Sequence, residues 1–356
     1  MSNRGPLPIQ HPLRLDNVHP ALRSCWHPVC RSSEVLDGSV LGVRLLGERW
    51  AIARIGGTLT AFADRCPHRM APLSAGRVCG GELECAYHGY RFDAAGACVH
   101  IPAIGADGRV PPTAAATRAH SVTERYGLVW IAPDEPVADL IDVPEWDDPS
   151  FTIVPLPTLD WNAAAAQMVD NFLDLSHFPF LHPVTFGDPT ATKVNDYEVE
   201  RDGWGSVTCY RHVTRLLHDP GDAGAPNTSE RADVFVYRAP FTIRLRIEYL
   251  AEDVVLTILF FHQPVDATTT RLYCYDLRND IADGRATVDG AREFQLAVAA
   301  EDQALVEQIA DKSISLDVTR EVHTRADRIT LEMRRIMADL VEHVASRSSS
   351  GPDEPA

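Results

Sequence analysis

Four residues of two types, closely spaced in one stretch, are the first candidates for chemistry in this sequence. The stretch CPHRMAPLSAGRVCGGELECAYHGY holds Cys66 and His68 in a C-x-H pair, and Cys85 and His88 in a C-x-x-H pair. Sixteen residues separate His68 from Cys85. Thiolates and imidazoles are ligands for iron and zinc. We therefore expect the two pairs to hold a metal centre between them.

Each pair offers one sulfur and one nitrogen ligand, and this mixture favours a particular centre. A Rieske [2Fe-2S] cluster carries two thiolates on one iron and two imidazoles on the other. Two rigid β-loops, with Pro67 and Gly89 at tight tips, would present one ligand of each type. A zinc finger instead pairs like with like, as C-x2-C and H-x3-H. Zinc and unliganded structural residues remain the alternatives to a Rieske cluster.

A second group of candidate ligands lies in the motif DNFLDLSHFPFLHP. Asn171, Asp174 and His177 fall at i, i+3 and i+6, within an arc of about 120° on one helix face. Pro179 is expected to end that helix, so that His182 turns back toward His177. Two histidines and one carboxylate form the facial triad of non-heme Fe(II) oxygenases. The alternative is that each histidine is an ordinary core residue.

The carboxylate of such a triad is expected from a later helix. Asp302 projects at the edge of an apolar stripe there, where an unpaired carboxylate would be costly. Glu301 lies about as close to the stripe on its other side, so periodicity alone leaves both residues open. The stripe consists of Phe294, Val298, Leu305 and Ile309.

Length and composition indicate a two-domain globular protein. The chain has 356 residues, of which 45% are hydrophobic and 23% charged. Its net charge of −17 disfavours nucleic acid as a partner. The sequence contains neither a run of 18 apolar residues nor an apolar signal region at its start, and its eight cysteines are scattered. We therefore expect a cytoplasmic protein without a membrane span or disulfide framework.

The order of strand-like and helix-like segments predicts an α+β protein whose first domain is all-β. Short alternating runs broken by glycine fill the first third, and a proline-rich acidic segment follows. The second domain begins with a helix, continues as a long β region and ends in helices. The expected divisions are a flexible N-terminus at 1–16, the cluster domain at 17–133, a linker at 134–150, the catalytic domain at 151–345 and a disordered tail at 346–356.

The cluster motif resembles the signature C-x-H-x(15 to 17)-C-x-x-H of Rieske oxygenases. Respiratory Rieske proteins carry an additional disulfide-forming cysteine in each loop, where this chain has Ala71 and Tyr87. They also carry a serine where Tyr90 stands, and its hydroxyl raises the cluster potential. An oxygenase-type cluster of lower potential is implied. Ala86 and Tyr90 depart from the usual CPYHGW of these oxygenases.

The chain resembles the vanillate O-demethylase and N-methyl-xanthine demethylase branch of Rieske non-heme iron oxygenases over nearly its whole length. This resemblance implies a helix-grip-type catalytic domain holding mononuclear Fe(II). It also assigns Asp302, within EDQALVE, as the third iron ligand, although Gln303 replaces the usual lysine. Asn171 matches a position near the iron, and a purely structural role for it stays open.

The resemblance further implies that assembly is part of the mechanism. Asp174 would connect His177 with a Rieske histidine of a neighbouring subunit, and His88 is the expected partner. A head-to-tail homotrimer would bring the cluster of one chain close to the iron of the next. Otherwise Asp174 would be an ordinary exposed helix acid. A separate NAD(P)H-dependent flavin reductase or ferredoxin would supply electrons, because the sequence has no G-x-G-x-x-G nucleotide motif.

The expected function is that of a terminal oxygenase that O- or N-demethylates a small aromatic or heterocyclic substrate with O2. Hydroxylation of a ring or alkyl carbon by the same site is one alternative. A Rieske electron-transfer or redox-sensing protein without mononuclear iron, and a zinc-stabilised binding protein of the steroid-transfer type, are others. The pocket walls are expected between residues 205 and 275, with polar groups from Arg211, His212, Tyr237 and His262.

Overall fold

The computed structural model describes residues 14–215, 217 and 228–349. Arg14 and Leu15, which fall within the predicted flexible N-terminus, form a short strand that pairs with Ile314–Ser315. Residues 346–349, from the predicted tail, belong to the last helix. The remaining parts of these two segments lie outside the described residues. None of the described helices has both the length and the apolar character that a bilayer crossing requires.

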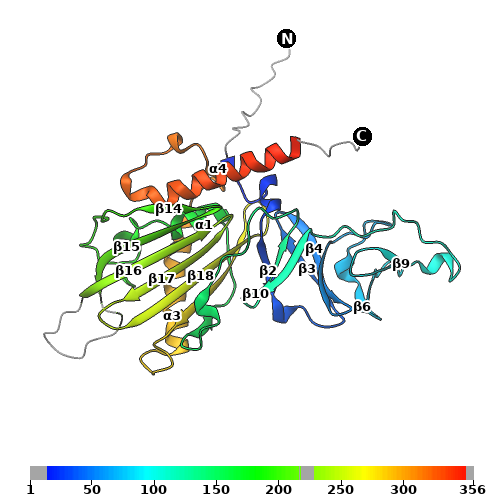
Figure 1. Cartoon of the computed structure of the whole chain (residues 1–356), viewed down its shortest axis with the longest axis horizontal. Helices are drawn as coiled ribbons and strands as arrows, with labels where there is room; N and C mark the ends of the chain where they lie inside the picture. Colours follow the sequence, from blue (N-terminus) through cyan, green and yellow to red (C-terminus); the bar gives the residue numbers. More distant parts are fainter. Residues whose placement is uncertain (1–13, 216, 218–227, 350–356) are drawn as a thin grey trace, which may run out of the picture.

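The first domain is all-β, as predicted, and consists of three small antiparallel sheets. Their strand orders are β3-β4-β5, β6-β7-β8-β9 and β10-β11-β2. The strands are β2 (His27–Arg31), β3 (Val40–Leu45), β4 (Glu48–Ile55), β5 (Thr58–Ala63), β6 (Arg77–Cys79), β7 (Glu82–Glu84), β8 (Arg91–Phe92), β9 (Cys98–His100), β10 (Ser121–Arg125) and β11 (Leu128–Ala132). In Figure 1, β6 and β9 lie at the end of the molecule farthest from the second domain.

The second domain is built on one eight-stranded antiparallel sheet. Its order is β12-β19-β18-β17-β16-β15-β14, and β13 pairs with β19 beside β12. The strands are β12 (Thr152–Pro155), β13 (Leu159–Trp161), β14 (Val199–Asp202), β15 (Gly205–Arg215), β16 (Thr228–Arg238), β17 (Thr242–Tyr249), β18 (Val254–Pro264) and β19 (Thr270–Arg278). A two-stranded ribbon of β1 (Arg14–Leu15) and β20 (Ile314–Ser315) stands apart from it. Together with the helices, this sheet confirms the predicted α+β class.

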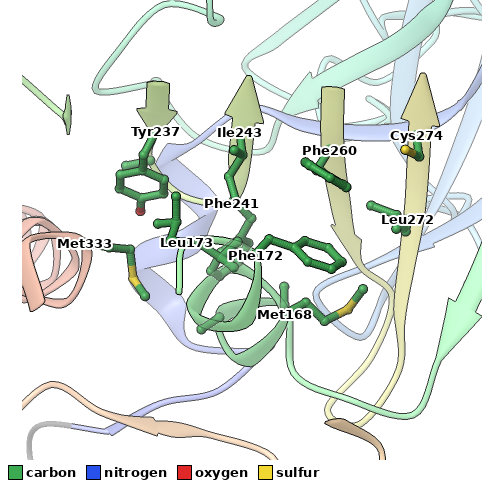
Figure 2. Close-up of a cluster of buried hydrophobic side chains, with 14 of the residues drawn as sticks. Met168, Phe172, Leu173, Tyr237, Phe241, Ile243, Phe260, Leu272, Cys274 and Met333 are labelled. Carbon is green, nitrogen blue, oxygen red and sulfur yellow. The ribbon is translucent and has the colours of Figure 1, made fainter. Parts of the chain in front are cut away.

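Four α-helices accompany the large sheet. They are α1 (Ala165–Phe172), α2 (Phe178–Leu181), α3 (Val288–Val306) and α4 (Arg328–Ser349). Figure 1 shows α3 running behind the strands and α4 along one edge. Figure 2 shows Met168 and Phe172 of α1, and Leu173 directly after it, among side chains from β16 to β19. This packing anchors α1, so the residues that follow it are held in place.

Strand β18 contains the apolar run VVLTILFF and is buried on both faces, which explains why it lacks the alternation of a half-exposed strand. Leu256, Ile258 and Phe260 belong to the core shared with the helices, whereas Leu259 and Phe261 pack in a second cluster beside the first domain. Because β18 is covered from both domains, the apolar core is continuous across them.

The segment predicted as a linker, 134–150, is packed rather than loose. Ile141 and Val143 are buried in the cluster between the domains. The buried carboxylate of Glu145 accepts hydrogen bonds from Arg246 Nη1 (2.9 Å) and Thr257 Oγ1 (3.1 Å) on the large sheet. These contacts tie the connection between the domains to the sheet.

Candidate active site

The two cysteine-histidine pairs lie in loops with the same backbone design. In each loop the cysteine N–H donates to the carbonyl five residues later, and the N–H four residues later donates to the cysteine carbonyl. The bonds join Cys66 to Ala71 (2.8 Å) and Met70 (2.9 Å), and Cys85 to Tyr90 (2.8 Å) and Gly89 (3.0 Å). The fourth residue after each cysteine has positive φ, 55° at Met70 and 70° at Gly89. Gly89 therefore occupies a conformation that suits glycine.

The loops bring the thiols together on the inside and the imidazoles together on the outside. Cys66 and Cys85 are each 2% exposed, whereas the His68 and His88 rings lie at the surface with centroids 4.5 Å apart. Burial, with a smaller contribution from the Cys85 thiol, raises the pKa of Cys66 to about 11. Thiols this buried would need a cation to hold them as thiolates. Tyr90 stacks on the His68 ring at 4.6 Å.

This separation into a sulfur pair and a nitrogen pair argues against a single zinc ion. A tetrahedral ion would draw all four ligand atoms within about 4 Å of one another. Among the described residues, the potential ligands that come within 4.8 Å of one another in a group of three or more are His177, His182 and Asp302. These residues lie far from the cysteine-histidine pairs in the sequence. Two separate pairs fit the two irons of a [2Fe-2S] cluster.

The second motif does not form the single helix that periodicity predicts. Helix α1 ends at Phe172, so Asn171, Asp174 and His177 do not share one helix face. The Asp174 carboxylate accepts hydrogen bonds from the backbone N–H groups of Ser176 (3.1 Å) and His177 (2.9 Å). An acidic side chain that binds nearby backbone in this way competes with helix continuation.

Pro179 begins a helix here and does not end one. Helix α2 starts at Phe178, with His177 as its N-cap, and proline is well accommodated in a first helical turn. His182 is the C-cap of the same short helix. The two histidines therefore flank one helical turn, and the predicted meeting of His182 with His177 occurs by a different route.

Three ligand atoms from distant positions meet beside α2. His177 Nε2 lies 3.2 Å from His182 Nε2 and 3.7 Å from Asp302 Oδ1. His182 Nε2 lies 3.2 Å from the same oxygen. Ligands about 2.1 Å from a metal and separated by 90–110° would be about 3.0–3.4 Å apart. Two sides of the triangle fall in this range and the third, at 3.7 Å, is slightly longer, so a small movement of one side chain would fit the three atoms to a metal ion.

The outer nitrogen of each histidine is occupied by a carboxylate. His177 Nδ1 lies 3.0 Å from Asp174 Oδ2, and His182 Nδ1 lies 2.7 Å from Glu301 Oε2. With a proton on each Nδ1, both Nε2 lone pairs face inward toward Asp302. Three acceptors that converge in a largely buried site repel one another unless a cation lies between them. The donor set therefore fits a divalent metal.

Helix α3 places Asp302 and Glu301 in different surroundings. Its buried residues are Ala291, Gln295, Ala299, Asp302 and Val306, and this face differs from the predicted stripe. Leu305 and Ile309 of that stripe are 49% and 44% exposed. Asp302 is buried on the true inner face, whereas Glu301 contacts His182 from the side. Two of these five residues are alanines and two are polar, and periodicity weighted by hydrophobicity misses such a face.

Asn171 contacts the same group. Its Nδ2 donates to Asp302 Oδ1 at 2.9 Å, so it holds the carboxylate that faces both histidines. Carboxylates outweigh the effect of burial at His182: burial lowers the pKa of this ring, but Asp302 and Glu301 raise it more, and the net shift is upward.

A mainly apolar cavity opens beside these three ligands. The polar pocket residues expected from sequence are not among its walls: Arg211 is exposed, and Tyr237 and His262 bond to backbone carbonyls elsewhere in the core. His212 lies behind the wall, with Nε2 3.1 Å from Asp233. The walls are formed by Phe172, Phe178, Phe186, Leu245, Ile247, Leu256, Ile258, Phe260, Phe294 and Val298, with the polar Arg231, Tyr249 and Gln295.

Two side chains at this site were not given these positions by sequence reasoning. Glu301 was considered only as a rival ligand, although it orients His182. Arg231 carried a signal: in the strand pattern ERADVFVY, Arg231 and Asp233 have the same parity as the buried Phe235 and Tyr237. Charged residues on the inward face of a strand indicate a polar feature in the core.

Comparisons with known proteins agree with this geometry. Two family models match the chain: the Rieske [2Fe-2S] domain over residues 25–118 and the Vanillate O-demethylase oxygenase C-terminal domain over residues 161–343. Methylxanthine N1-demethylase NdmA of Pseudomonas putida is 31% identical over 335 residues, which cover 90% of each chain. Methylxanthine N3-demethylase NdmB of the same organism is 32% identical over 340 residues, 91% of this chain and 90% of that protein.

The solved structures show the same relationship. The structure of Pseudomonas putida CBB5 NdmA with caffeine matches with a TM-score of 0.80 and 29% identity, covering 93% of this chain and 94% of that one. An all-β domain with paired Cys/His loops, joined to an α+β domain with a two-histidine, one-carboxylate site, defines a Rieske-type oxygenase.

The chain belongs to the Rieske oxygenases whose catalytic domain is of the vanillate O-demethylase type. It is thus an oxidoreductase with a Rieske [2Fe-2S] cluster and mononuclear iron as cofactors. The predicted family and cofactors are confirmed by these matches.

Proposed function

We propose that this protein is a terminal oxygenase that removes an N- or O-methyl group from a small aromatic or heterocyclic substrate. One observation carries the proposal: His177, His182 and Asp302 converge beside an apolar cavity. When bound there, iron would supply the activation of O2 for insertion into a substrate C–H bond. Oxygen inserted into a methyl carbon yields a hemiaminal or hemiacetal, which releases formaldehyde.

The protein side chains have separate tasks in this proposal. His177, His182 and Asp302 hold the metal, and Asp174 and Glu301 fix the imidazoles from behind. Asn171 steadies the Asp302 carboxylate by its 2.9 Å hydrogen bond. Apolar walls exclude water and favour a flat, weakly polar substrate.

Relatives support demethylation over ring hydroxylation. The two Pseudomonas putida proteins are named as N-demethylases. The oxygenase component of dicamba O-demethylase from Stenotrophomonas maltophilia is 37% identical over 167 residues, 45% of this chain and 48% of that protein. Its name as a component also supports electron supply by a separate NAD(P)H-dependent reductase or a ferredoxin.

A head-to-tail homotrimer is proposed as the active assembly. In Figure 1 strand β6, near the cluster loops, belongs to the first domain, whereas helices α1 and α3 belong to the second. Asp174 both bonds to His177 and lines a surface groove that contains five carboxylates and three guanidinium groups. The exposed cluster loops carry Arg65 and Arg69. Opposite charges would favour docking of one chain's loops into the groove of the next.

Leu305 and Ile309 support the same docking surface. Both are apolar, nearly half exposed and part of the groove wall. Apolar side chains rimmed by charged ones are typical of protein interfaces. In the proposed trimer, Asp174 links His177 to a Rieske histidine, His88, supplied by the neighbouring subunit.

Formaldehyde release tests the proposed reaction. Purified protein, a surrogate reductase and NAD(P)H are incubated with a panel of methoxyarenes and N-methyl heterocycles, and the expected product is formaldehyde with the matching demethylated compound. Hydroxylated products without formaldehyde would contradict demethylation. Iron analysis tests the site itself: about three irons per chain are expected for the wild type, and about two for His182→Ala.

A further inference from the structure

The cavity that the proposed iron ligands line also contains a buried cation. Arg231 on β16 lines the cavity and is only 4% exposed. Its neighbours in the wall are apolar apart from Tyr249 and Gln295. We infer that Arg231 and Tyr249 form a recognition site for an uncharged acceptor oxygen of the substrate, such as a ring or ketone carbonyl. This inference rests on the proposed function, because it describes the substrate of the same cavity.

The guanidinium group has donors to spare. Arg231 Nε donates to Asp233 Oδ1 at 2.5 Å, and Nη1 lies 3.4 Å from the Tyr249 hydroxyl. Among the described residues these are its two hydrogen-bond partners. A guanidinium has five N–H donors and no acceptor, so several donors remain for a ligand in the cavity.

Tyr249 adds a second donor of the same polarity. Its hydroxyl accepts from Arg231, which leaves the phenolic proton free to donate. Burial raises the pKa of Tyr249, so that proton is retained near neutral pH. The charged Arg231 donors and the Tyr249 hydroxyl proton at one point of the wall favour a ligand group that accepts hydrogen bonds.

The position of Arg231 suits a molecule of one or two rings. The Phe186 ring stacks on the His182 ring at 4.7 Å, and the Arg231 guanidinium carbon lies 5.9 Å from the Phe186 ring centre. Arg231 and the His182 ring therefore both lie against Phe186, within about 11 Å of each other. A substrate spanning this distance would place its acceptor at Arg231 and its methyl group toward His182.

Charge compensation decides between a neutral and an anionic acceptor. Asp233 is fully buried and already pairs with Arg231, and its other oxygen lies 3.1 Å from His212 Nε2. A second carboxylate, from a substrate, would share a cation that is already neutralised. Burying a charge without its own counter-ion is strongly unfavourable. The site therefore favours a carbonyl oxygen over a carboxylate.

Equilibrium binding to the holoprotein, without reductase so that no turnover occurs, tests this inference. Five probes in two sets are titrated by calorimetry. The first set is 4-methoxyacetophenone, 4-ethylanisole and 4-methoxybenzoate, and the second is 1-methyloxindole and 1-methylindole. The carbonyl member of each set is expected to bind at least about tenfold more tightly than its analogue without the carbonyl, the effect of a hydrogen bond to a charged donor. 4-Methoxyacetophenone is expected to exceed the anionic 4-methoxybenzoate by at least the same factor. Equal binding within both sets, tighter binding of the benzoate, or no detectable binding of either carbonyl probe would overturn the inference.

Paired variants separate recognition from folding. Arg231→Met alone leaves Asp233 buried without its cation, so the double variant Arg231→Met, Asp233→Asn is the main test. The matched control is Arg278→Met, Asp280→Asn, because Arg278 and Asp280 form another buried pair two residues apart, outside the cavity wall. The first double variant is expected to lose the carbonyl preference, and the control to keep it at a similar melting temperature. Loss in both, or in neither, would refute a specific role.

The binding and turnover results are distinguishable. Formaldehyde release with binding that ignores the carbonyl would leave the proposed demethylation standing and refute this inference. Arg231-dependent carbonyl binding without formaldehyde would support the recognition site and refute demethylation.

Discussion

At the scale of single residues, the site depends on carboxylates behind the histidines as much as on the ligands themselves. Glu301 sits 2.7 Å from His182 Nδ1 and also accepts from Thr185 Oγ1 at 2.8 Å. A histidine held in this way keeps its Nε2 lone pair aimed at the metal. Glu301 and Asp302 are adjacent in the sequence but are proposed to have different roles, and the deeper burial of Asp302 distinguishes the two.

Glu301→Gln is expected to weaken iron binding without changing the cluster. The amide is a poorer acceptor for the His182 Nδ1 proton, and loss of such outer contacts typically reduces metal affinity by about 10- to 100-fold. Titration of iron-depleted protein with ferrous ion measures the change, and the cluster absorbance serves as an internal reference. Glu293→Gln, an exposed acid on the same helix, is the control. An unchanged affinity in Glu301→Gln would show that Glu301 does not orient His182.

A second residue-scale prediction concerns Asp276 on β19, which is buried and whose Oδ1 has no hydrogen-bond partner among the described residues. Burial raises its pKa to about 7, and Arg278 offsets this only in part. Because the pKa of Asp276 is higher in the folded than in the unfolded chain, its contribution to the free energy of unfolding is greatest below about pH 4 and declines as the pH rises toward 7. Asp276→Asn should therefore gain stability at pH 8, by up to about 4 kcal/mol.

Denaturant unfolding of wild type and Asp276→Asn at pH 5.5 and pH 8.5 measures this difference. The variant is expected to gain more at pH 8.5 than at pH 5.5, while Asp253→Asn, at an exposed turn, shows no such trend. Equal effects at both pH values would mean that Asp276 does not titrate between them.

At the scale of elements, the short helix α2 and the turns on either side of it create the iron site. The break after Phe172 lets Asp174 cap the chain and present His177, and α2 then carries His182 around to meet it. The turn after α2 is closed by a hydrogen bond from Gly187 N–H to the His182 carbonyl at 2.7 Å. Space at Gly187 is limited, since a Cβ there would lie 2.1 Å from the Phe178 carbonyl oxygen.

Gly187→Ala is consequently expected to displace α2 and His182. Forcing a methyl group into such a contact costs about 1–3 kcal/mol or moves the backbone. Iron content should fall from about three toward about two per chain, with the cluster spectrum retained. Gly284→Ala adds backbone strain at a φ of 80° but no clash, since a Cβ there meets no atom within 4 Å, and it is expected to keep all of its iron. Full iron occupancy in Gly187→Ala would contradict a positioning role for this turn.

At the scale of the whole molecule, the proposed electron path runs between chains. Figure 1 shows the cluster domain extending away from the sheet and helices that form the iron site. Asp174 lies where the iron site meets the surface groove. One chain would then supply the electron and its neighbour would use it.

Mixed trimers test this arrangement. His177→Ala chains keep the cluster, and Cys85→Ser chains keep the iron site, so neither alone should be active. Co-expressed chains that assemble at random should regain about a quarter of wild-type activity, because a quarter of head-to-tail interfaces join an intact cluster to an intact iron site. Activity of gel-filtered mixed trimers is the measurement. Inactive mixed trimers, with each variant assembling normally, would exclude transfer between chains.

The sequence by itself determined the metal chemistry of this protein. The spacing of Cys66, His68, Cys85 and His88 identified a Rieske cluster, because loop ligands are close in sequence and need only local structure. The motif with His177 and His182 indicated an iron site for the same reason, and strand and helix patterns gave the α+β class.

Only the tertiary structure showed which acid lies beside both histidines and which side chains line the cavity. Asp302 lies far from the histidines in sequence, and its burial depends on how α3 packs. The break between α1 and α2 depends on side-chain bonds from Asp174 that compete with the helix. Likewise, Arg231 faces the cavity because of its register in the sheet. Such long-range packing is set by the whole fold, so local periodicity does not contain it.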